Sequence, residues 1–198
     1  MEQSNHKCPW QVLLIGGASG TGKTSVSYQV ARHFEVGIAE VDDFQIILEL
    51  MTSPTEQPIL HQCWSSECFR LPVEEIVELQ IAVGKVMMPA LEAVVANHIE
   101  TDTPIVLEGD YVSPALMSRC SQLGRVGAVF LHEADEVQIL RNFSQREPDR
   151  GEQRKRARVN WLYGEWLKKE AERSGLPVVE ARPWESVFKR VIEAIPSL

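Results

Sequence analysis

The stretch LLIGGASGTGKTSVSYQVA, residues 13–31, places four glycines, several small hydroxyl side chains and one lysine between an apolar run and a helical pattern. The apolar run, WQVLLIGG at residues 10–17, is typical of a strand that is buried on both faces of a parallel sheet. Apolar residues then recur at helical spacing over residues 24–34, which predicts a helix that begins near Gly22. Glycines at such a junction indicate that the backbone approaches another group closely.

Residues 17–24 read GASGTGKT and match the pattern G-x-x-x-x-G-K-[ST] between a predicted strand and a predicted helix, the context that this motif requires. Its glycines let successive backbone N–H groups turn toward an anion, and the start of a helix adds its positive dipole end. Lys23 is expected to neutralise the β- and γ-phosphates, and the Thr24 hydroxyl to ligate Mg²⁺. The residues expected to bind a nucleotide are Gly17, Ala18, Ser19, Gly20, Thr21, Gly22, Lys23, Thr24 and Ser25. A glycine-rich turn without a ligand is the alternative.

The rest of the chain alternates apolar runs with helical patterns. Four further strands are expected within residues 36–44, 103–112, 124–132 and 176–183. Helices are expected at residues 44–51, 73–99, 114–122, 134–146, 153–174 and 184–195, and Pro89 is expected to kink or divide the second of them. This alternation predicts βαβ units with a mostly parallel sheet, and therefore an α/β fold.

The composition excludes some classes of partner. The 20 basic and 28 acidic residues give a formal net charge of -8, which argues against a surface that binds nucleic acid or an anionic membrane as a whole. The hydrophobic fraction of 44% is enough for one sizeable core, so residues 1–198 are expected to form a single domain. The N-terminal segment has too few apolar residues for a signal peptide or a membrane span, so a cytoplasmic location is expected. The scattered cysteines, Cys8, Cys63, Cys68 and Cys120, are typical of reduced thiols.

Acidic residues follow two of the predicted strands. Asp42 and Asp43 come at the end of the second strand, and Glu108 and Asp110 at the end of the third. Ligands of open α/β sheets bind beyond the carboxyl ends of the strands. One carboxylate there can take a proton from an incoming hydroxyl, and another can hold Mg²⁺ through water. Either of the two adjacent aspartates could instead cap a helix that begins near Phe44.

A basic segment, residues 141–158, follows the fourth predicted strand. It holds seven basic and three acidic residues, and seven minus three gives a net charge of +4. Pro148 and Gly151 divide it into helix, turn and helix, which predicts a hinged lid whose arginines stabilise a transferring phosphoryl group and whose closure excludes water. Arg146 and Arg150 flank the turn and are the expected lid residues. A solvated basic helix face is the alternative.

Three other segments have expected roles. Residues 52–72 form an irregular stretch of turn formers and aromatics, so residues 43–72 are expected to bind the acceptor, with His61, Trp64, Phe69 and Arg70 as candidate lining residues. The turn with Arg182, Pro183 and Trp184 is expected to lie against an adenine ring or to anchor the last helix. The helical spacing of Trp161, Tyr163 and Trp166 favours the core over base stacking.

In these features the chain resembles the small-molecule kinases of the P-loop superfamily. The group concerned is similar to nucleoside monophosphate kinases and includes chloramphenicol phosphotransferase, shikimate kinase and 2-phosphoglycerate kinase-like proteins. The matching stretches, in chain order, are GGASGTGKTS (16–25), EVDDF (40–44), IVLEGDYV (105–112), RNFSQREPDRG (141–151) and ARPWES (181–186). The first of these stretches is a highly specific match. The other four are weaker matches, but all five occur in the family's order along most of the chain, which supports the resemblance.

The resemblance implies a three-layer αβα sandwich with a five-stranded parallel sheet, a helical lid and an adenine-binding turn after the fifth strand. It also implies ATP and Mg²⁺ as cofactors, Asp42 as the base and Glu108 or Asp110 beside the metal. The residues expected to contact the acceptor are Asp43, Arg70, Glu108 and Tyr111. Relatives that act on phosphorylated acids often carry an arginine where this chain has Gln45. The lack of that positive charge argues against a phosphorylated acid as the acceptor, unless Arg70 supplies the charge instead.

The expected function is ATP-dependent transfer of a phosphoryl group to a hydroxyl of a small molecule. The sequence does not choose between an antibiotic, a sugar, a nucleoside and a phosphorylated acid as the acceptor. No membrane partner is expected, and nucleic acid is disfavoured. A nucleotide-sensing ATPase module without an acceptor would need the glycine-rich loop alone. A polynucleotide kinase would share the loop, the base and the lid. A GTPase is excluded by the lack of an N-K-x-D motif, and an ATP-driven motor is disfavoured because glycine separates the two acids of IVLEGD.

Overall fold

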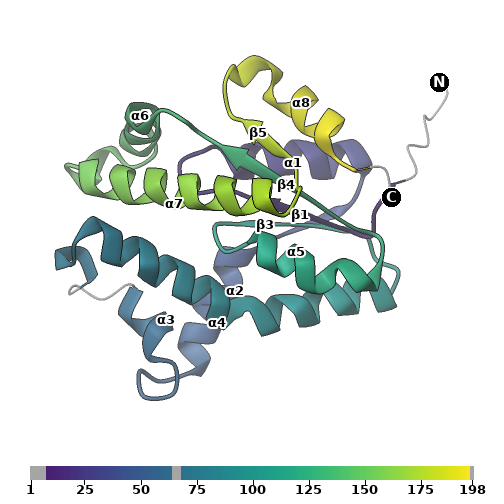
Figure 1. The fold of residues 1–198 in the computed structure, drawn as a ribbon, viewed down its shortest axis with the longest axis horizontal. Helices are drawn as coiled ribbons and strands as arrows, with labels where there is room; N and C mark the ends of the chain where they lie inside the picture. The colour runs from purple at the N-terminus through teal and green to yellow at the C-terminus, as the bar shows by residue number, and fades with distance from the viewer. Residues whose placement is uncertain (1–7, 64–67, 197–198) are drawn as a thin grey trace.

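A five-stranded sheet forms the centre of the computed structural model, which describes residues 8–63 and 68–196 (Figure 1). The paired strands are all parallel, and their order is β2-β3-β1-β4-β5. The strands are β1 (Val12–Gly16), β2 (Gly37–Glu40), β3 (Ile105–Gly109), β4 (Val126–His132) and β5 (Val178–Glu180). The predicted α/β fold with a parallel sheet is therefore confirmed.

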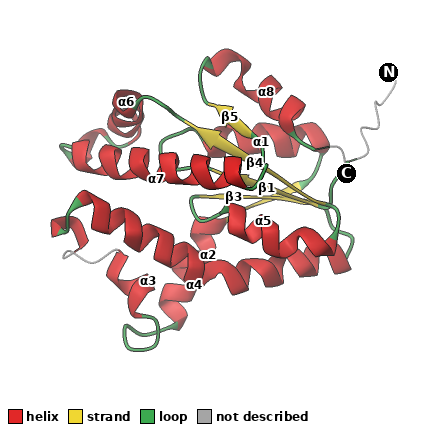
Figure 2. Ribbon diagram, in the orientation of Figure 1, coloured by secondary structure: helices red, strands yellow, loops and turns green. Residues whose placement is uncertain are grey.

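Helices cover both faces of the sheet, so the molecule has three layers (Figure 2). Helices α1 and α8 pack on one face, and α4, α5 and α7 on the other (Figure 1). The α-helices are α1 (Lys23–Phe34), α2 (Val41–Met51), α3 (Pro58–Cys63), α4 (Val73–Glu100), α5 (Pro114–Cys120), α6 (Glu136–Arg146), α7 (Arg154–Arg173) and α8 (Val187–Ala194). Short 3₁₀ turns lie at η1 (Cys68–Arg70), η2 (Ser121–Leu123), η3 (Pro148–Arg150) and η4 (Trp184–Ser186).

The core has two halves, because alternate side chains of each strand point to opposite faces of the sheet. Leu14 belongs to the half that contains Leu91 of α4, while its neighbour Leu13 belongs to the half that contains Val26 and Val30 of α1. Each of these side chains is almost fully buried. Burial of one such side chain contributes about 2 kcal/mol to stability, so the two halves hold the sheet between its helices.

The strand register brings the expected site together. Ile15 is level with Glu108, and Glu40 at the end of β2 is also level with Glu108. The glycine-rich loop after β1, the first turn of α2 after β2, and Asp110 after β3 therefore leave the sheet at the same edge. Because β1 lies between β3 and β4, the segment that follows β4 reaches this edge as well.

Helix α2 begins three residues earlier than the sequence predicts. Its first residue is Val41 rather than Phe44, and its N-cap is Glu40, whose side chain makes no capping hydrogen bond. Asp42 and Asp43 therefore lie inside the first turn of the helix, and the alternative in which one of them caps it is wrong. The cause is tight packing: Val41 is fully buried and so close to Gly109 that a Cβ at Gly109 would come within 2.7 Å of the Val41 Cβ.

Helix α4 is continuous, although Pro89 lies inside it. Proline removes one backbone donor and crowds the preceding turn, but Met87 and Leu91 on either side of it are buried in the core and hold both halves of the helix in place. Within the described residues α4 alone is long and apolar enough to cross a membrane. Since it packs against α3, α5 and α7, we assign it to the core.

The irregular stretch at residues 52–72 is more ordered than the sequence predicts, because α3 and η1 lie within it. Trp64 and the side chain of Phe69 lie outside the described part of the chain. Cys8 and Cys120 are free thiols in the part of the chain that the structure describes, and the side chain of Cys63 lies outside that part, so the expectation of four reduced cysteines stays a prediction. Tyr163 is buried in the core and stacks on Trp166, with ring centroids 5.5 Å apart, which supports the core assignment of these aromatics.

Candidate functional site

The glycine-rich loop adopts a backbone that few residues other than glycine can adopt. Gly20 and Gly22 both have φ of 88°, in the left-handed region. A Cβ at Gly20 would lie 2.9 Å from a methyl group of Ile139, and one at Gly22 would collide with the indole of Trp184. The side-chain amide of Asn142 donates to the carbonyl of Gly20 over 2.7 Å. The loop is thus held between α6 and η4 in a fixed shape at the start of α1, the geometry that suits a bound phosphate.

Lys23 forms an ion pair with the carboxylate of Asp110 and is 6% exposed. Burial alone would lower the pKa of Lys23, but the carboxylates of Asp110, Glu108 and Asp42 outweigh it, so the pKa is raised. The ammonium group therefore stays charged, and the carboxylate of Asp110 holds it at the mouth of the loop.

Glu108 is a carboxyl group at the end of a fully buried strand, and 2% of it is exposed. Burial raises the pKa of Glu108 to about 7, against the opposing effects of Lys23 and of a hydrogen bond from Thr24. Its Oε2 atom has no hydrogen-bond partner within the described residues. An unpaired carboxylate oxygen beside a hydroxyl is a donor set that fits a hard cation such as Mg²⁺. The described residues include no cluster of three or more His, Cys, Asp or Glu side chains that could hold a metal by themselves, so such an ion would also need phosphate or water ligands.

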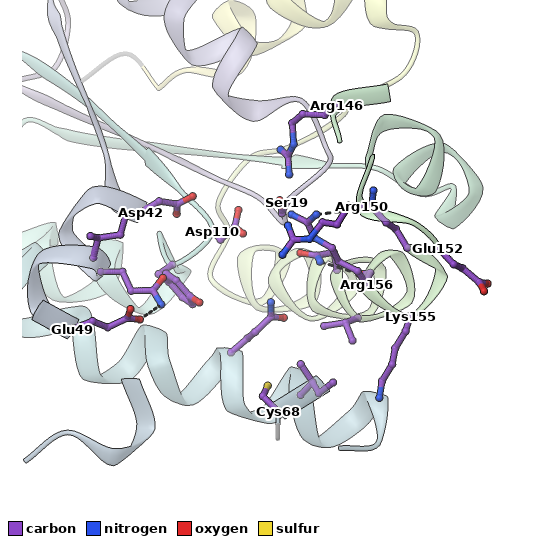
Figure 3. A pocket seen from close by; sticks show the side chains of 18 residues that line it. Ser19, Asp42, Glu49, Cys68, Asp110, Arg146, Arg150, Glu152, Lys155 and Arg156 are labelled. Carbon is purple, nitrogen blue, oxygen red and sulfur yellow. Dashed lines mark hydrogen bonds between the residues drawn. The ribbon is translucent and has the colours of Figure 1, made fainter. Parts of the chain in front are cut away.

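Asp42 projects from the first turn of α2 into the same region (Figure 3). Its side chain is exposed, and it lines the cavity described below. Burial raises the pKa of Asp42 to about 6, and the nearby carboxylate of Asp110 raises it further while Lys23 opposes the shift. A carboxyl group with such a pKa is ionised at neutral pH and can still accept a proton, which suits a general base.

A cavity of about 860 Å³ opens where these groups meet (Figure 3). Acids and amides line one part of it, and arginines from the segment after β4 line another. The lining residues are Ser19, Asp42, Gln45, Ile46, Glu49, Cys68, Ile76, Gln80, Asp110, Tyr111, Arg146, Arg150, Glu152, Gln153, Lys155, Arg156, Val159 and Asn160. Its size is sufficient for a nucleotide phosphate chain together with a small acceptor.

The structure brings some of the expected site residues to this cavity and leaves others outside its lining. Six of them line it: Ser19, Asp42, Asp110, Tyr111, Arg146 and Arg150. Three more lie behind the lining: Lys23 pairs with Asp110, and Glu108 lies near Lys23 and accepts a hydrogen bond from Thr24. The expected residues that do not line it include Asp43, Arg70, Arg182, Pro183 and Trp184.

The turn after β5 contacts the glycine-rich loop rather than the cavity. Trp184 packs against Gly22, and Arg182 pairs over 3.0 Å with Glu133, which is buried. The guanidinium of Arg182 also lies 5.7 Å from the centroid of the Trp184 ring. This turn therefore supports the loop from behind, and its contact with an adenine ring stays a prediction.

Several cavity residues were not singled out from the sequence. They are Ile46, Glu49, Cys68, Ile76, Gln80, Glu152, Gln153, Lys155, Arg156, Val159 and Asn160, together with Gln45, which the sequence analysis mentions only because it differs from the arginine of some relatives. One signal was available: Gln153, Arg156 and Asn160 are spaced by three and four residues, so they share a helix face. That face would have pointed to α7 as a wall of the site.

The buried carboxyl of Glu108 predicts that the ligand-free protein is more stable in mild acid than in mild base. A pKa raised from 4.5 to about 7 gives stability that is present below 4.5 and is lost as the pH rises through 7. Between pH 5 and pH 8 we expect the Tm of the protein to fall by on the order of 5 °C. Thermal denaturation of the wild type and of Glu108→Gln checks this, since the variant should lose most of the pH dependence. An equal fall in both proteins would contradict the assignment.

Several solved structures share this fold. A gluconokinase from Sinorhizobium meliloti 1021 has a TM-score of 0.55 and 16% sequence identity, and the match covers 94% of this chain and 91% of that one. A putative kinase from Chloroflexus aurantiacus J-10-fl has a TM-score of 0.51 and 13% identity, with 93% and 98% covered. A sugar kinase from Janibacter sp. HTCC2649 has a TM-score of 0.51 and 18% identity, with 92% of each chain covered. At these identities the likeness shows a shared fold alone.

No curated protein matches the sequence. The model of one family, Isopentenyl transferase (IPT), matches residues 10–142. The matched span includes β1, the glycine-rich loop, the first turn of α2 and the end of β3, and it stops inside α6, before the lid turn. The narrower kinase group that the sequence resembles stays a prediction. Because the match covers more than half of the chain and includes the glycine-rich loop, the chain belongs to the isopentenyl transferase family.

Proposed function

We propose that the protein is an ATP- and Mg²⁺-dependent phosphotransferase that moves the γ-phosphoryl group of ATP to a hydroxyl group of a small molecule. The observation that carries the proposal is that a candidate base, a P-loop lysine and lid arginines meet at one cavity. Asp42, Asp110, Arg146 and Arg150 all line it, and Lys23 is paired with Asp110 at its edge.

In the proposed reaction the glycine-rich loop and Lys23 bind the phosphates of ATP. The acceptor donates its hydroxyl proton to the carboxylate of Asp42, and its oxygen attacks the γ-phosphorus atom. The bond between that phosphorus and the bridging oxygen breaks, and ADP leaves with the electron pair. Arg146 and Arg150 face the transferring group and stabilise its negative charge.

The residues present fit a magnesium ion beside the phosphates. Thr24 and Glu108 would hold it, through the hydroxyl and the unpaired Oε2 atom, with Asp110 as a further ligand through water. When bound, Mg²⁺ would neutralise charge on the phosphate oxygens. Glu108 must lose its proton to take this role, and a cation in place of that proton lowers its pKa below the raised value.

The acceptor side of the cavity favours a ligand with several hydrogen-bond donors. The side-chain amide of Gln45 donates over 2.6 Å to one carboxylate oxygen of Glu49, and both residues line this wall of the cavity. The side-chain oxygens of Gln80 and Asn160 are buried without a hydrogen-bond partner in the described part of the chain. Buried acceptors without a donor cost stability until a donor reaches them. A polyol or an amino-bearing sugar fits this wall better than a phosphorylated acid, because Arg70 does not line the cavity.

Transfer of an isopentenyl group is a second candidate, favoured by the family match. The cavity also has an apolar wall, formed by Cys68, Ile76 and Val159. In this reaction the glycine-rich loop would hold the diphosphate leaving group, and Asp42 would take a proton from the nucleophile. Both candidates use the same loop and the same base, and they differ in the bond that breaks.

The donor assay separates the two candidates. The protein is incubated with Mg²⁺ and either ATP or dimethylallyl diphosphate, together with a panel of polyols, amino sugars and nucleosides, and the products are identified by mass spectrometry. We expect ADP and a phosphorylated acceptor from ATP. Release of diphosphate with an isopentenylated product would replace our proposal with the second candidate. ATP hydrolysis that no acceptor increases would indicate a nucleotide-sensing module.

A further inference from the structure

Glu147, at the end of α6, binds three arginines of the cavity through one carboxylate. Arg146 donates from Nε and Nη2 to Oε1, over 3.1 and 2.9 Å. Arg150 and Arg156 each donate from Nη1 to Oε2, over 2.6 and 2.8 Å. The three guanidinium groups lie around the cavity beside Ser19 of the glycine-rich loop (Figure 3). The carboxylate thus occupies the centre of an arginine cluster that faces the phosphate site.

Contacts that do not involve the Glu147 carboxylate hold Arg156 and the backbone of Glu147 in place. The guanidinium of Arg156 lies 4.2 Å from the centroid of the Phe143 ring, within the range of a cation–π contact. The side-chain amide of Gln153 donates over 3.1 Å to the backbone carbonyl of Glu147 itself. The Glu147 side chain can therefore leave the arginines while its own backbone and Arg156 stay in place.

Charge favours exchange of this carboxylate for a phosphate. Three arginines and one glutamate give a net charge of three minus one, or +2, so the cluster remains attractive to an anion. The hydrogen bonds from Arg156, Arg150 and Arg146 lower the pKa of Glu147 to about 2, so the group is an anion throughout the physiological range. A phosphate has more oxygens and more charge than a carboxylate, and guanidinium groups bind both in the same forked geometry.

We infer that Glu147 is an internal anion that holds Arg146, Arg150 and Arg156 together in the nucleotide-free protein and is displaced from them by a phosphate group. The inference rests on the proposed function in one respect, since it takes the cavity to be the phosphate site. Glu147 acts through the arginines and is a positioning residue. It lowers the affinity of the cluster for phosphate in the ground state, and it gives the arginines a partner again when product leaves.

The first test measures the binding of inorganic tripolyphosphate by calorimetry, which needs no turnover. Glu147→Gln removes the competing charge, and we expect its Kd for tripolyphosphate to be about tenfold lower than that of the wild type. Asp149→Asn is the matched control, because Asp149 lies in the next turn, is exposed and changes the charge by the same amount. Its Kd should change much less. An equal gain in both variants, an unchanged Kd or weaker binding in Glu147→Gln would each overturn the inference.

The second test uses the wild-type protein and so does not depend on how the variant folds. The carboxyl ¹³C signal of Glu147, assigned sequentially in the wild-type protein, reports its pKa with and without tripolyphosphate. We expect the low pKa of the free protein to rise when the anion binds, because the carboxylate loses its arginine donors. A pKa that does not move while the anion binds would overturn the inference.

Kinetics separate this inference from the proposed reaction. If ATP is a substrate, Glu147→Gln should lower the KM for ATP without raising kcat, because it strengthens ground-state binding. If no acceptor is ever phosphorylated but tripolyphosphate binds with the expected shifts, the proposed function fails while the role of Glu147 stands. If neither the wild type nor Glu147→Gln binds tripolyphosphate, the inferred role of Glu147 fails.

Discussion

Replacement of Asp42 by asparagine is expected to lower kcat by about 10²- to 10⁴-fold while the affinity for ATP stays near that of the wild type. Asparagine has almost the same shape but cannot take a proton from the acceptor. Asp42 lines the cavity from the first turn of α2, outside the glycine-rich loop itself. Steady-state turnover with the acceptor found in the donor assay, together with ATP binding by calorimetry, measures the two quantities separately.

Asp43→Asn is the matched control for this variant, because Asp43 lies in the same helical turn and does not line the cavity. We expect it to keep near-wild-type turnover. The pH profile adds a second criterion: the pKa of Asp42 is raised to about 6, so the wild-type kcat/KM should rise with pH and level off above about 6. The residual rate of Asp42→Asn should lack that rise. Equal losses in both variants would show that the turn matters for structure and that Asp42 is not the base.

Local chemistry explains why the glycine-rich loop and the acidic residues beside it could be brought together from the sequence. The loop is short, Gly20 and Gly22 adopt the left-handed backbone conformation that favours glycine, and Lys23 follows them at a fixed spacing. The parallel strands before and after it are continuous apolar runs, so the sheet and its carboxyl edge follow from the pattern. Little tertiary information was needed for Asp42, Glu108 and Asp110, because each lies at or within two residues of a strand end.

The acceptor half of the site could not be predicted, because it is assembled from residues that are far apart in the chain. Gln80 of α4 and Asn160 of α7 meet at one cavity because those two helices pack together. In the sequence both read as polar positions on amphipathic helices. The role of Glu147 was hidden for a related reason: a run of mixed charges does not show which acid three arginines will share.

Replacement of Lys23 by methionine is expected to have two large effects, loss of phosphate binding and loss of stability. Lys23 is almost fully buried and faces three carboxylates, those of Asp110, Glu108 and Asp42. Without the ammonium group these carboxylates repel one another. Removal of one partner from a buried ion pair costs roughly 3 kcal/mol, so the Tm at pH 8 should fall by several degrees. Much of that loss should be recovered near pH 5, because protonation then relieves the repulsion.

The double variant Lys23→Met with Asp110→Asn separates the two effects. Removal of the partner carboxylate leaves no unpaired charge at that position, so stability at pH 8 should return most of the way to the wild-type value. Tripolyphosphate and ATP binding should not return, because the positive charge that the phosphates need is still missing. Denaturation and calorimetry on the two single variants and the double variant form a complete cycle. If binding returned together with stability, Lys23 would matter to the fold and not to the phosphates, and the assignment of the loop as the nucleotide site would fail.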